Sequence, residues 1–255
     1  MMAYTIEKSE KGYLLFTITR GNKRNAVDYD VMEGLSKAIH HAADPDVLAL
    51  VITGEGENAF CSGGDLSVFH LLETEEEAYS MLSKMSKILY SLLTLPIPTI
   101  ALMNGHAVGG GCEIAIACDF RLARKGIKAG FIQGKQSITT GWGGGTILAE
   151  KLPNPLYMKL LMDAEVHKIE RLNEIGLIDA LYETDPIKEC ETFLENLLFK
   201  DKGVLQSYKQ IWIGRWEETK LQERIEKEVR NCARLWENES HHQYVKMFMN
   251  KKTNN

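Results

Sequence analysis

Two apolar runs of this chain lead into clusters of glycines, and each cluster is followed by a helix-like pattern. The first cluster is CSGGD at 61–65, and the second is VGGGCE at 108–113. Glycine tolerates unusual backbone dihedrals, and the amides at a helix start lack intrahelical partners. If the two turns face one another, two N–H groups can stabilise one oxyanion or enolate. Such turns also occur where a strand and a helix merely pack closely, so spacing alone leaves both interpretations open.

The order of strand-like and helix-like segments predicts a layered α/β domain. Strands are predicted within 3–19 (two, joined at KSEKG), over 46–54, over 98–105 and over 120–124. Helices are predicted over 30–43 with Asp28 or Asp30 as N-cap, from Asp65 to about Leu95, and over CEIAIACD at 112–119. Buried apolar strands that alternate with helices are typical of parallel sheets.

From about residue 185 onward the pattern is helical. Leu221, Ile225, Val229 and Cys232 recur at spacings of four and three, which places them on one apolar stripe of a helix. We therefore divide the chain into a core at 1–185 and a C-terminal helical region at 186–255. The stripe must be covered, either by the core or by a neighbouring subunit.

Composition excludes several classes of protein. A net charge of −5 over 255 residues does not favour nucleic-acid binding. The five cysteines form no CxxC pair, and the N-terminal sequence turns polar before a signal peptide could form. The most apolar stretch, 88–103, contains two prolines and is too short to span a bilayer. We expect a soluble, cytoplasmic protein with reduced cysteines and no membrane or nucleic-acid partner. The glycine patterns also match neither GxGxxG nor a P-loop.

Four stretches, in this order and spacing, resemble the enoyl-CoA hydratase/isomerase (crotonase) family. They are RNAVD (24–28), AFCSGGDL (59–66), NGHAVGGGCEIAIACDFRLA (104–123) and GWGGGT (141–146). The resemblance covers nearly the whole chain. It implies an α/β fold in which a spiral of β-β-α units forms two roughly perpendicular sheets, with C-terminal helices that assemble homotrimers or dimers of trimers. It also implies acyl-CoA thioester substrates, with coenzyme A as part of the substrate and no metal or further cofactor.

The resemblance assigns roles residue by residue. The amides of Gly64 and Gly110 would polarise the thioester carbonyl, and Glu113 would be one of two glutamates that position and activate water. The other implied contacts are Lys23, Arg24 and Ala26 near the CoA nucleotide, and Asp65 and Leu66 beside the pantetheine and acyl carbons.

Three further residues are weaker candidates for substrate contacts. Phe131 and Trp142 are candidates for the acyl pocket, although large aromatic residues are core residues at least as often. His106 is a candidate proton donor, although a packing role is the commoner one for such a histidine. Cys61 and Cys112 flank the glycine turns, and with no adjacent base they are interpreted as small buried residues.

The pattern breaks at the second glutamate. Hydratases of the family use one about twenty residues after the first, so that two carboxylates share the acid–base work. Here the corresponding stretch is GFIQGKQ at 130–136, where Gln133, Gly134 or Lys135 takes that place. No Asp or Glu occurs from Phe120 to Ala149. The second carboxylate is therefore absent.

Three functions remain open. The first is a hydratase-like lyase that hydrates a trans-2-enoyl-CoA, with Glu113 as the main acid and base; we take this as the leading expectation. The second is a decarboxylase of ethylmalonyl- or methylmalonyl-CoA, because the oxyanion hole can hold the enolate and no base has to remove a carbon-bound proton. ACDFRLA followed by GWGGGT resembles that branch, and His106 or Glu113 would protonate the enolate. The third is a non-catalytic CoA-binding scaffold. An isomerase fits less well, because its base usually occupies the missing position.

Overall fold

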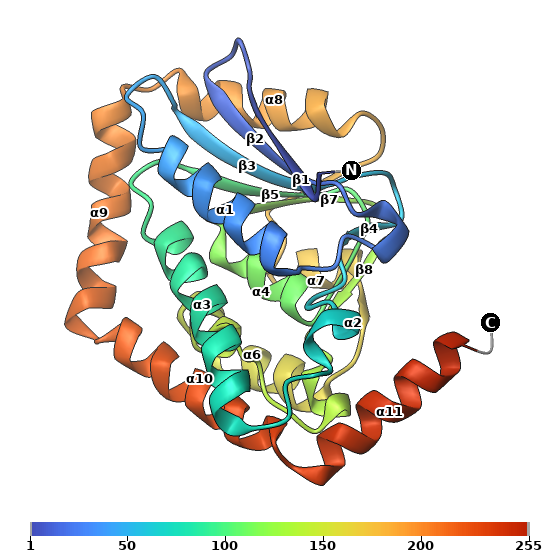
Figure 1. The fold of residues 1–255 in the computed structure, drawn as a ribbon. Coiled ribbons are helices and arrows are strands. Elements are labelled where there is room, and N and C mark those ends of the chain that lie inside the picture. The colour runs from blue at the N-terminus through green and yellow to red at the C-terminus, as the bar shows by residue number, and fades with distance from the viewer. Residues whose placement is uncertain (1, 254–255) are drawn as a thin grey trace.

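Apolar runs of the sequence form a six-stranded sheet in the computed structural model, which describes residues 2–253 (Figure 1). Its strands lie in the order β1 (Tyr4–Lys8), β2 (Tyr13–Ile18), β3 (Ala49–Gly54), β5 (Thr99–Met103), β7 (Phe120–Arg124) and β10 (Ala180–Tyr182). β1 and β2 pair antiparallel, and every later pair is parallel. The predicted strands within 3–19, 46–54, 98–105 and 120–124 are confirmed.

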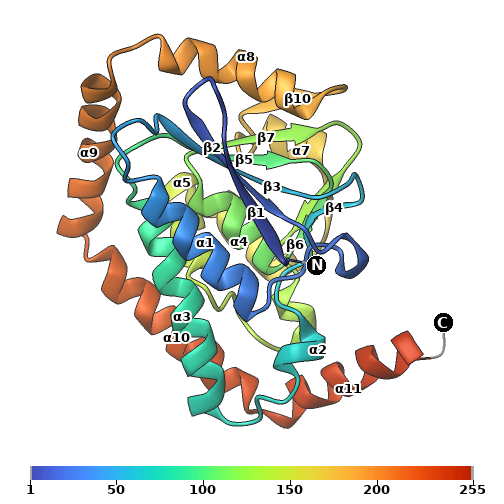
Figure 2. The ribbon, with the colours of Figure 1, turned by 45° about the horizontal axis from the view of Figure 1, so that its top comes forward.

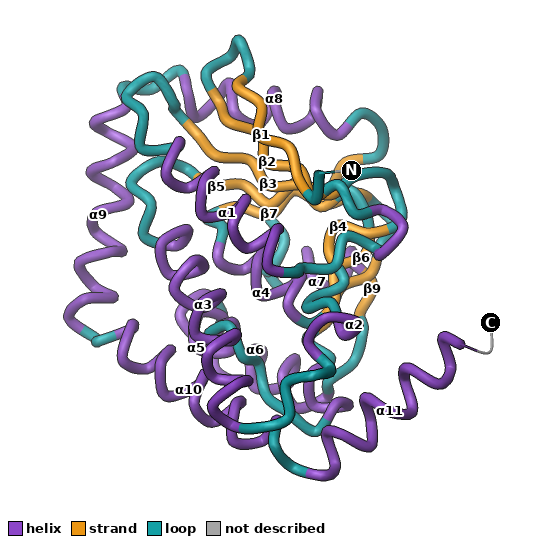
Figure 3. Tube along the Cα trace, viewed as in Figure 1, coloured by secondary structure: helices purple, strands orange, loops and turns teal. Residues whose placement is uncertain are grey.

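A second, smaller sheet contains the strands β4 (Ala59–Cys61), β6 (His106–Val108), β8 (Lys128–Gly130) and β9 (His167–Lys168), in that order. The pairs β3–β4, β5–β6 and β7–β8 each place their first strand in the large sheet and their second in the small one. Figure 3 shows the small sheet running across the direction of the large one. The predicted spiral of β-β-α units with two sheets is confirmed.

Helices cover both faces of the large sheet (Figure 2). One face packs on α1 (Tyr29–His41), α3 (Glu75–Leu93) and α4 (Gly110–Ala117) in the main hydrophobic core. The other face, with Ile100, Leu102 and Leu122, is covered by Cys190 and Leu194 of α8 (Pro186–Leu198). The remaining elements are η1 (Gly21–Lys23), α2 (Leu66–Phe69), η2 (Gln133–Gln136), α5 (Gly144–Lys151), α6 (Asn154–Asp163), α7 (Ile169–Glu174), α9 (Lys202–Glu218), α10 (Leu221–Trp236) and α11 (Glu239–Thr253).

Two helix predictions meet different outcomes. Asp28 is the N-cap of α1, and its Oδ1 accepts a hydrogen bond of 3.0 Å from the amide of Val31. The single helix expected from Asp65 to about Leu95 is wrong, because α2 ends at Phe69 and α3 begins at Glu75. A capping box starts α3, in which Thr74 and Glu77 satisfy one another's backbone amides.

The apolar stripe of the C-terminal region packs on this chain's own core. Leu221, Ile225, Val229 and Cys232 all lie on α10 and are buried in the main core. α10 packs against α3 and α5, while α11 extends away from the body of the molecule (Figure 1). None of the helices in the described range 2–253 is long and apolar enough to cross a membrane. The trimer or dimer of trimers stays a prediction.

Candidate active site

Three segments that carry predicted site residues leave the same edge of the small sheet. β4, β6 and β8 are parallel neighbours, so their carboxyl ends meet at one edge. Gly64 follows β4 and pairs with Val27, α4 begins at Gly110 directly after β6, and Gln133 follows β8. The repeated β-β-α architecture therefore brings together residues that are far apart in the sequence.

A cleft of about 680 Å³ opens at this edge, a volume in the range of ordinary small-molecule sites. Nine predicted residues line it: Lys23, Arg24, Ala26, Gly64, Asp65, Leu66, Gly110, Glu113 and Trp142. The C-terminal helices supply part of the wall through Trp236 of α10 and Tyr244 of α11. The cleft thus combines an exposed basic end, at Lys23 and Arg24, with an apolar interior.

The two glycine turns contact one another, and close packing explains their composition. A methyl group on Gly63 would lie 3.1 Å from the amide nitrogen of Gly110. A methyl group on Gly110 would lie only 2.1 Å from the indole of Trp142, so no larger residue fits there. Among the hydrogen bonds of the described residues, none uses the amides of Gly64 or Gly110. Gly110 is the first residue of α4, where an amide has no intrahelical acceptor.

Glu113 is buried, with 2% of its surface exposed, and its carboxylate is held from several sides. Oε2 accepts hydrogen bonds from the amides of Trp142 (2.9 Å) and Gly144 (2.8 Å). Oε1 accepts one from Nε2 of Gln133 (2.9 Å) and a longer one from the amide of Gly141 (3.4 Å). Each oxygen therefore accepts two hydrogen bonds, and Oε1, which has the longer main-chain contact, is the less tightly held of the two.

The surroundings of Glu113 give it an unusual acid strength. Burial raises the pKa of this carboxyl to about 7, and the nearby charge of Glu228 contributes to the rise. The amides of Gly144, Trp142 and Gly141 act in the opposite direction, because they stabilise the ionised form. A carboxyl group with this pKa can take up and release protons near neutral pH, as general acid–base catalysis requires.

Glu228 of α10 is a site residue that the sequence did not reveal. Its carboxylate accepts hydrogen bonds from the hydroxyl of Thr140 (2.5 Å) and from the amides of Gly145 (3.0 Å) and Thr146 (2.6 Å). Glu113 and Glu228 therefore each bind different main-chain amides at the start of α5. The only signal for Glu228 was a glutamate beside the apolar stripe of α10, and such glutamates are common on exposed helix faces.

The sequence offered Gln133, Gly134 or Lys135 for the position of the missing second glutamate. In the structure it is Gln133 whose side chain contacts Glu113. It is 7% exposed and lines the cleft, and its Nε2 contacts Glu113 as described. Its Oε1 is buried and has no hydrogen-bond partner within residues 2–253. The side chain beside Glu113 is thus a neutral amide that cannot exchange a proton as a carboxylate does.

An ion pair shapes the wall around Asp65. Arg20 contacts Asp65 at 2.7 Å and Asp28 at 3.0 Å, and it also donates to the carbonyl of Ala26. The other oxygen of Asp65 accepts from the hydroxyl and amide of Ser67. Asp65 lines the cleft as predicted, but its carboxylate is committed to this network. Arg20, which sequence reasoning missed, holds the loop 20–28 against the turn after β4.

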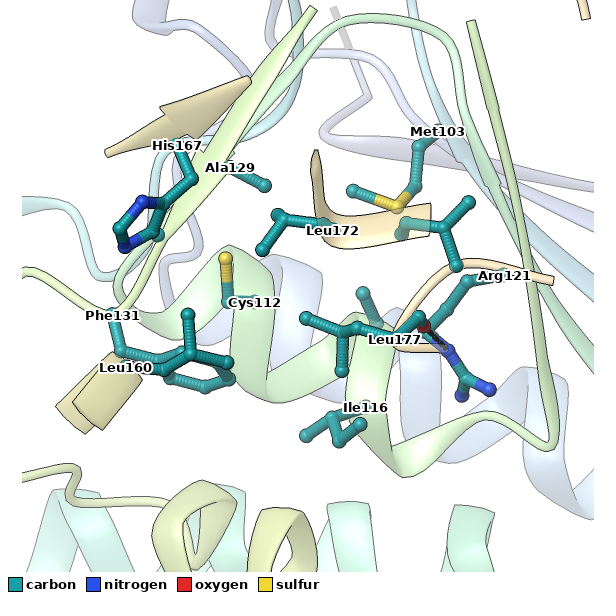
Figure 4. Close-up of a pocket in the computed structure, with 13 residues that line it drawn as sticks. Met103, Cys112, Ile116, Arg121, Ala129, Phe131, Leu160, His167, Leu172 and Leu177 are labelled. Atoms are coloured by element: carbon teal, nitrogen blue, oxygen red, sulfur yellow. Dashed lines mark hydrogen bonds between the residues drawn. The ribbon is translucent and has the colours of Figure 1, made fainter. Parts of the chain in front are cut away.

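Two predicted contacts need correction. His106 lies at the exposed start of β6, does not line the cleft, and accepts a hydrogen bond through Nδ1 from the amide of Lys128 (2.9 Å). Phe131 points into a separate apolar cavity behind α4, together with Cys112 and Leu160 (Figure 4). That cavity measures about 20 Å³, room for about one water molecule. Neither side chain is among the residues that line the cleft.

The cysteines beside the glycine turns are buried and free. Burial raises the pKa of both Cys61 and Cys112 to about 12. A thiol with such a pKa is protonated at neutral pH and is a poor nucleophile. The interpretation of both residues as packing residues agrees with this environment.

The cleft therefore holds two glycines whose main-chain amides have no acceptor among the described residues, Gly64 and Gly110, together with a buried carboxyl whose pKa is raised to about 7. The family model described as enoyl-CoA hydratase/isomerase matches residues 8–255, so the chain belongs to this family. The crystal structure of an enoyl-CoA hydratase/isomerase from Mycobacterium paratuberculosis superposes with a TM-score of 0.88 at 20% identity, covering 97% of this chain and 98% of that one. This likeness confirms the fold.

Curated relatives of this chain carry out two different reactions. Ethylmalonyl-CoA decarboxylase from Bos taurus is 28% identical over 236 residues, which cover 91% of this chain and 76% of the relative. Mitochondrial methylglutaconyl-CoA hydratase from Mus musculus is 31% identical over 179 residues, which cover 70% of this chain and 57% of the relative. The chain is thus similar both to a decarboxylase and to a hydratase.

Proposed function

We propose that this protein decarboxylates a malonyl-type acyl-CoA thioester, of the ethylmalonyl or methylmalonyl kind. The amides of Gly64 and Gly110 bind the thioester oxygen. The bond between the α-carbon and the carboxylate breaks, its electron pair forms the enolate, and carbon dioxide leaves. Glu113 then transfers a proton from Oε1 to the α-carbon, and the thioester carbonyl is restored. No metal and no cofactor beyond the substrate's coenzyme A takes part.

One observation carries this proposal: the side chain that contacts Glu113 at 2.9 Å is the amide of Gln133. Hydration needs a proton acceptor for water and a proton donor for carbon, which two carboxylates of opposed protonation supply. Among residues lining the cleft, the remaining carboxylate belongs to Asp65, which is engaged by Arg20 and Ser67. Decarboxylation needs only the enolate-binding amides and one acid, and Glu113 supplies that acid.

A hydratase is the second candidate. The similarity to methylglutaconyl-CoA hydratase favours it, and so does the retention of Glu113. In this case Glu113 would both accept the proton of water and return it to the α-carbon. The absence of a second carboxylate removes a contribution that is typically about 10²–10⁴-fold in rate. We therefore place hydration behind decarboxylation.

The CoA moiety is proposed to lie along the basic end of the cleft. Lys23 and Arg24 are exposed there, within reach of a nucleotide phosphate, and Asp65 and Leu66 lie deeper beside the pantetheine path. We further propose that the protein is cytoplasmic and works as a homotrimer or a dimer of trimers.

The test offers the purified protein ethylmalonyl-CoA, methylmalonyl-CoA and crotonyl-CoA separately. Release of carbon dioxide with formation of butyryl- or propionyl-CoA supports the decarboxylase. Loss of the enoyl absorbance of crotonyl-CoA without release of carbon dioxide would replace it with the hydratase. Saturable binding of all three esters without turnover would indicate a CoA-binding scaffold.

A further inference from the structure

The turn that leads into α5 is held by two carboxylates from different helices. Glu113 of α4 binds the amides of Trp142 and Gly144, and Glu228 of α10 binds those of Gly145 and Thr146. Consecutive amides, of residues 144 and 145, thus point to different glutamates. Glu113 is buried and Glu228 is half-buried, and a methyl group on Gly144 would touch Glu113. The two acids lie on either side of one short stretch of main chain.

A helix start stabilises one nearby anion strongly, whereas two buried anions repel one another. Burial raises the pKa of Glu228, and three donors, including the hydroxyl of Thr140, oppose this rise because they stabilise its negative charge. Once Glu228 is ionised, a second negative charge on Glu113 is disfavoured. When Glu113 is protonated on Oε1, its Oε2 still accepts from the amides of Trp142 and Gly144.

We propose that Glu228 is a positioning residue for Glu113: as the ionised carboxylate at the start of α5, it holds the 140–146 turn and keeps Glu113 in its proton-donating form. This inference deepens the proposed decarboxylation and rests on it for the use made of the proton. One of the groups that affect the protonation of Glu113 thus comes from α10, in the C-terminal helical region. The catalytic acid itself remains Glu113.

Other titratable and charged groups near Glu113 and Glu228 could also affect the protonation of Glu113. Burial raises the pKa of the Cys112 thiol on α4 and of the Cys232 thiol on α10, so both are neutral. Several neighbouring charged groups have partners of their own: Arg224 of α10 pairs with Glu150 of α5, Glu226 accepts from Tyr79 of α3, and Asp65 pairs with Arg20. Burial lowers the pKa of Lys151 to about 7, and its Nζ donates to the carbonyls of Ile116 and Cys118. Glu228 is the group whose charge acts on Glu113.

The test follows the titration of the Glu113 carboxyl directly, by ¹³C NMR of side-chain-labelled glutamate assigned with Glu113→Gln. In the wild type we expect Glu113 to titrate near pH 7. In Glu228→Gln the midpoint of Glu113 should fall by about one pH unit or more. Glu228→Asp, which retains the charge, should restore it. The matched control is Glu226→Gln, which removes a more exposed carboxylate of the same helix and should leave the midpoint unchanged.

The pH profile of carbon dioxide release should move in step with that midpoint. An unmoved Glu113 midpoint in a folded Glu228→Gln protein would overturn the inference. So would a wild-type midpoint at the ordinary glutamate value, and that measurement needs no variant. If the midpoint moves but no malonyl-type ester is decarboxylated, the inference about Glu228 stands and the proposed reaction fails.

Discussion

Nε2 of Gln133 donates a hydrogen bond of 2.9 Å to Oε1 of Glu113, and the two residues follow neighbouring strands of the small sheet. The contact places a neutral amide beside the one buried acid of the cleft that is free to titrate. Since an amide does not act as a general acid or base at neutral pH, this contact gives Glu113 no second carboxylate with which to share proton transfers.

Replacing Gln133 by Glu should create hydratase activity. The new carboxylate would lie against Glu113, and two coupled carboxyls titrate apart, so that one is an acid while the other is a base. We expect hydration of crotonyl-CoA to rise by about 10²-fold or more, and release of carbon dioxide from ethylmalonyl-CoA to fall. Both rates are measured on the same preparation. Gln133→Met serves as the matched neutral control and should show no gain; a gain in both variants would argue against the carboxylate.

Gly110→Ala should weaken the binding of the developing oxyanion. The added methyl would lie 2.1 Å from the indole of Trp142, so the first turn of α4 must shift and carry its amide with it. We expect kcat to fall about 10²–10³-fold, the loss typical of a displaced oxyanion donor. Gly214→Ala is the control, because a methyl group there meets nothing within 4 Å on α9. That variant should keep full activity, and equal losses in both would point to a general effect on folding.

Glu113→Gln should lower the rate of decarboxylation by about 10²–10⁴-fold and change how stability depends on pH. The folded-state pKa of Glu113 is raised from 4.5 to about 7, so the folded protein binds this proton more tightly than the unfolded chain does. The stabilisation is complete below pH 4.5 and is lost as pH rises through about 7. The difference in unfolding free energy between wild type and variant should therefore shrink by roughly 3 kcal/mol over this range. Chemical denaturation of both proteins at several pH values measures it, and a constant difference would contradict the assignment.

Arg24→Ala should weaken the binding of the nucleotide end of the substrate. Arg24 is exposed beside the cleft, and a charge-assisted contact with phosphate contributes about 1.5–3 kcal/mol before screening by salt. We expect the Kd of butyryl-CoA to rise about tenfold in low salt, with the Kd of butyryl-pantetheine unchanged. Isothermal calorimetry with both ligands measures the ratio. Lys87→Ala, an exposed change on α3, is the control, and equal weakening of both ligands would place Arg24 away from the phosphates.

The sequence predicted the large sheet well and the small sheet poorly. β3 and β5 are continuous apolar runs, which indicate buried parallel strands. β4, β6 and β8 have three residues each and lie within glycine-rich stretches, where no periodicity can develop. The break between α2 and α3 was missed because no glycine or proline marks it. The capping box at Thr74 marks the start of α3, but its hydrogen bonds are visible only in the folded structure.

The site was predictable where local motifs carry it. Gly64, Gly110 and Glu113 stand in short patterns, and all three line the cleft. Arg20 and Glu228 could not be found, because their partners Asp65 and Thr140 lie far along the chain and meet them only in the folded protein. The misplacement of His106 and Phe131 has a related cause: nearness in sequence to a glycine turn does not say whether a side chain points into the cleft or away from it.

Trp142 contacts both the proposed proton donor, Glu113, and the turn that carries Gly110. Its main-chain nitrogen binds the acid, and its ring lies against the α-carbon of Gly110. One residue therefore contacts both the buried acid, through its main chain, and the second glycine turn, through its ring. A smaller side chain at this position would keep the main-chain bond to Glu113 and lose the packing against Gly110, so we expect the glycine turn to change while the acid keeps its donor.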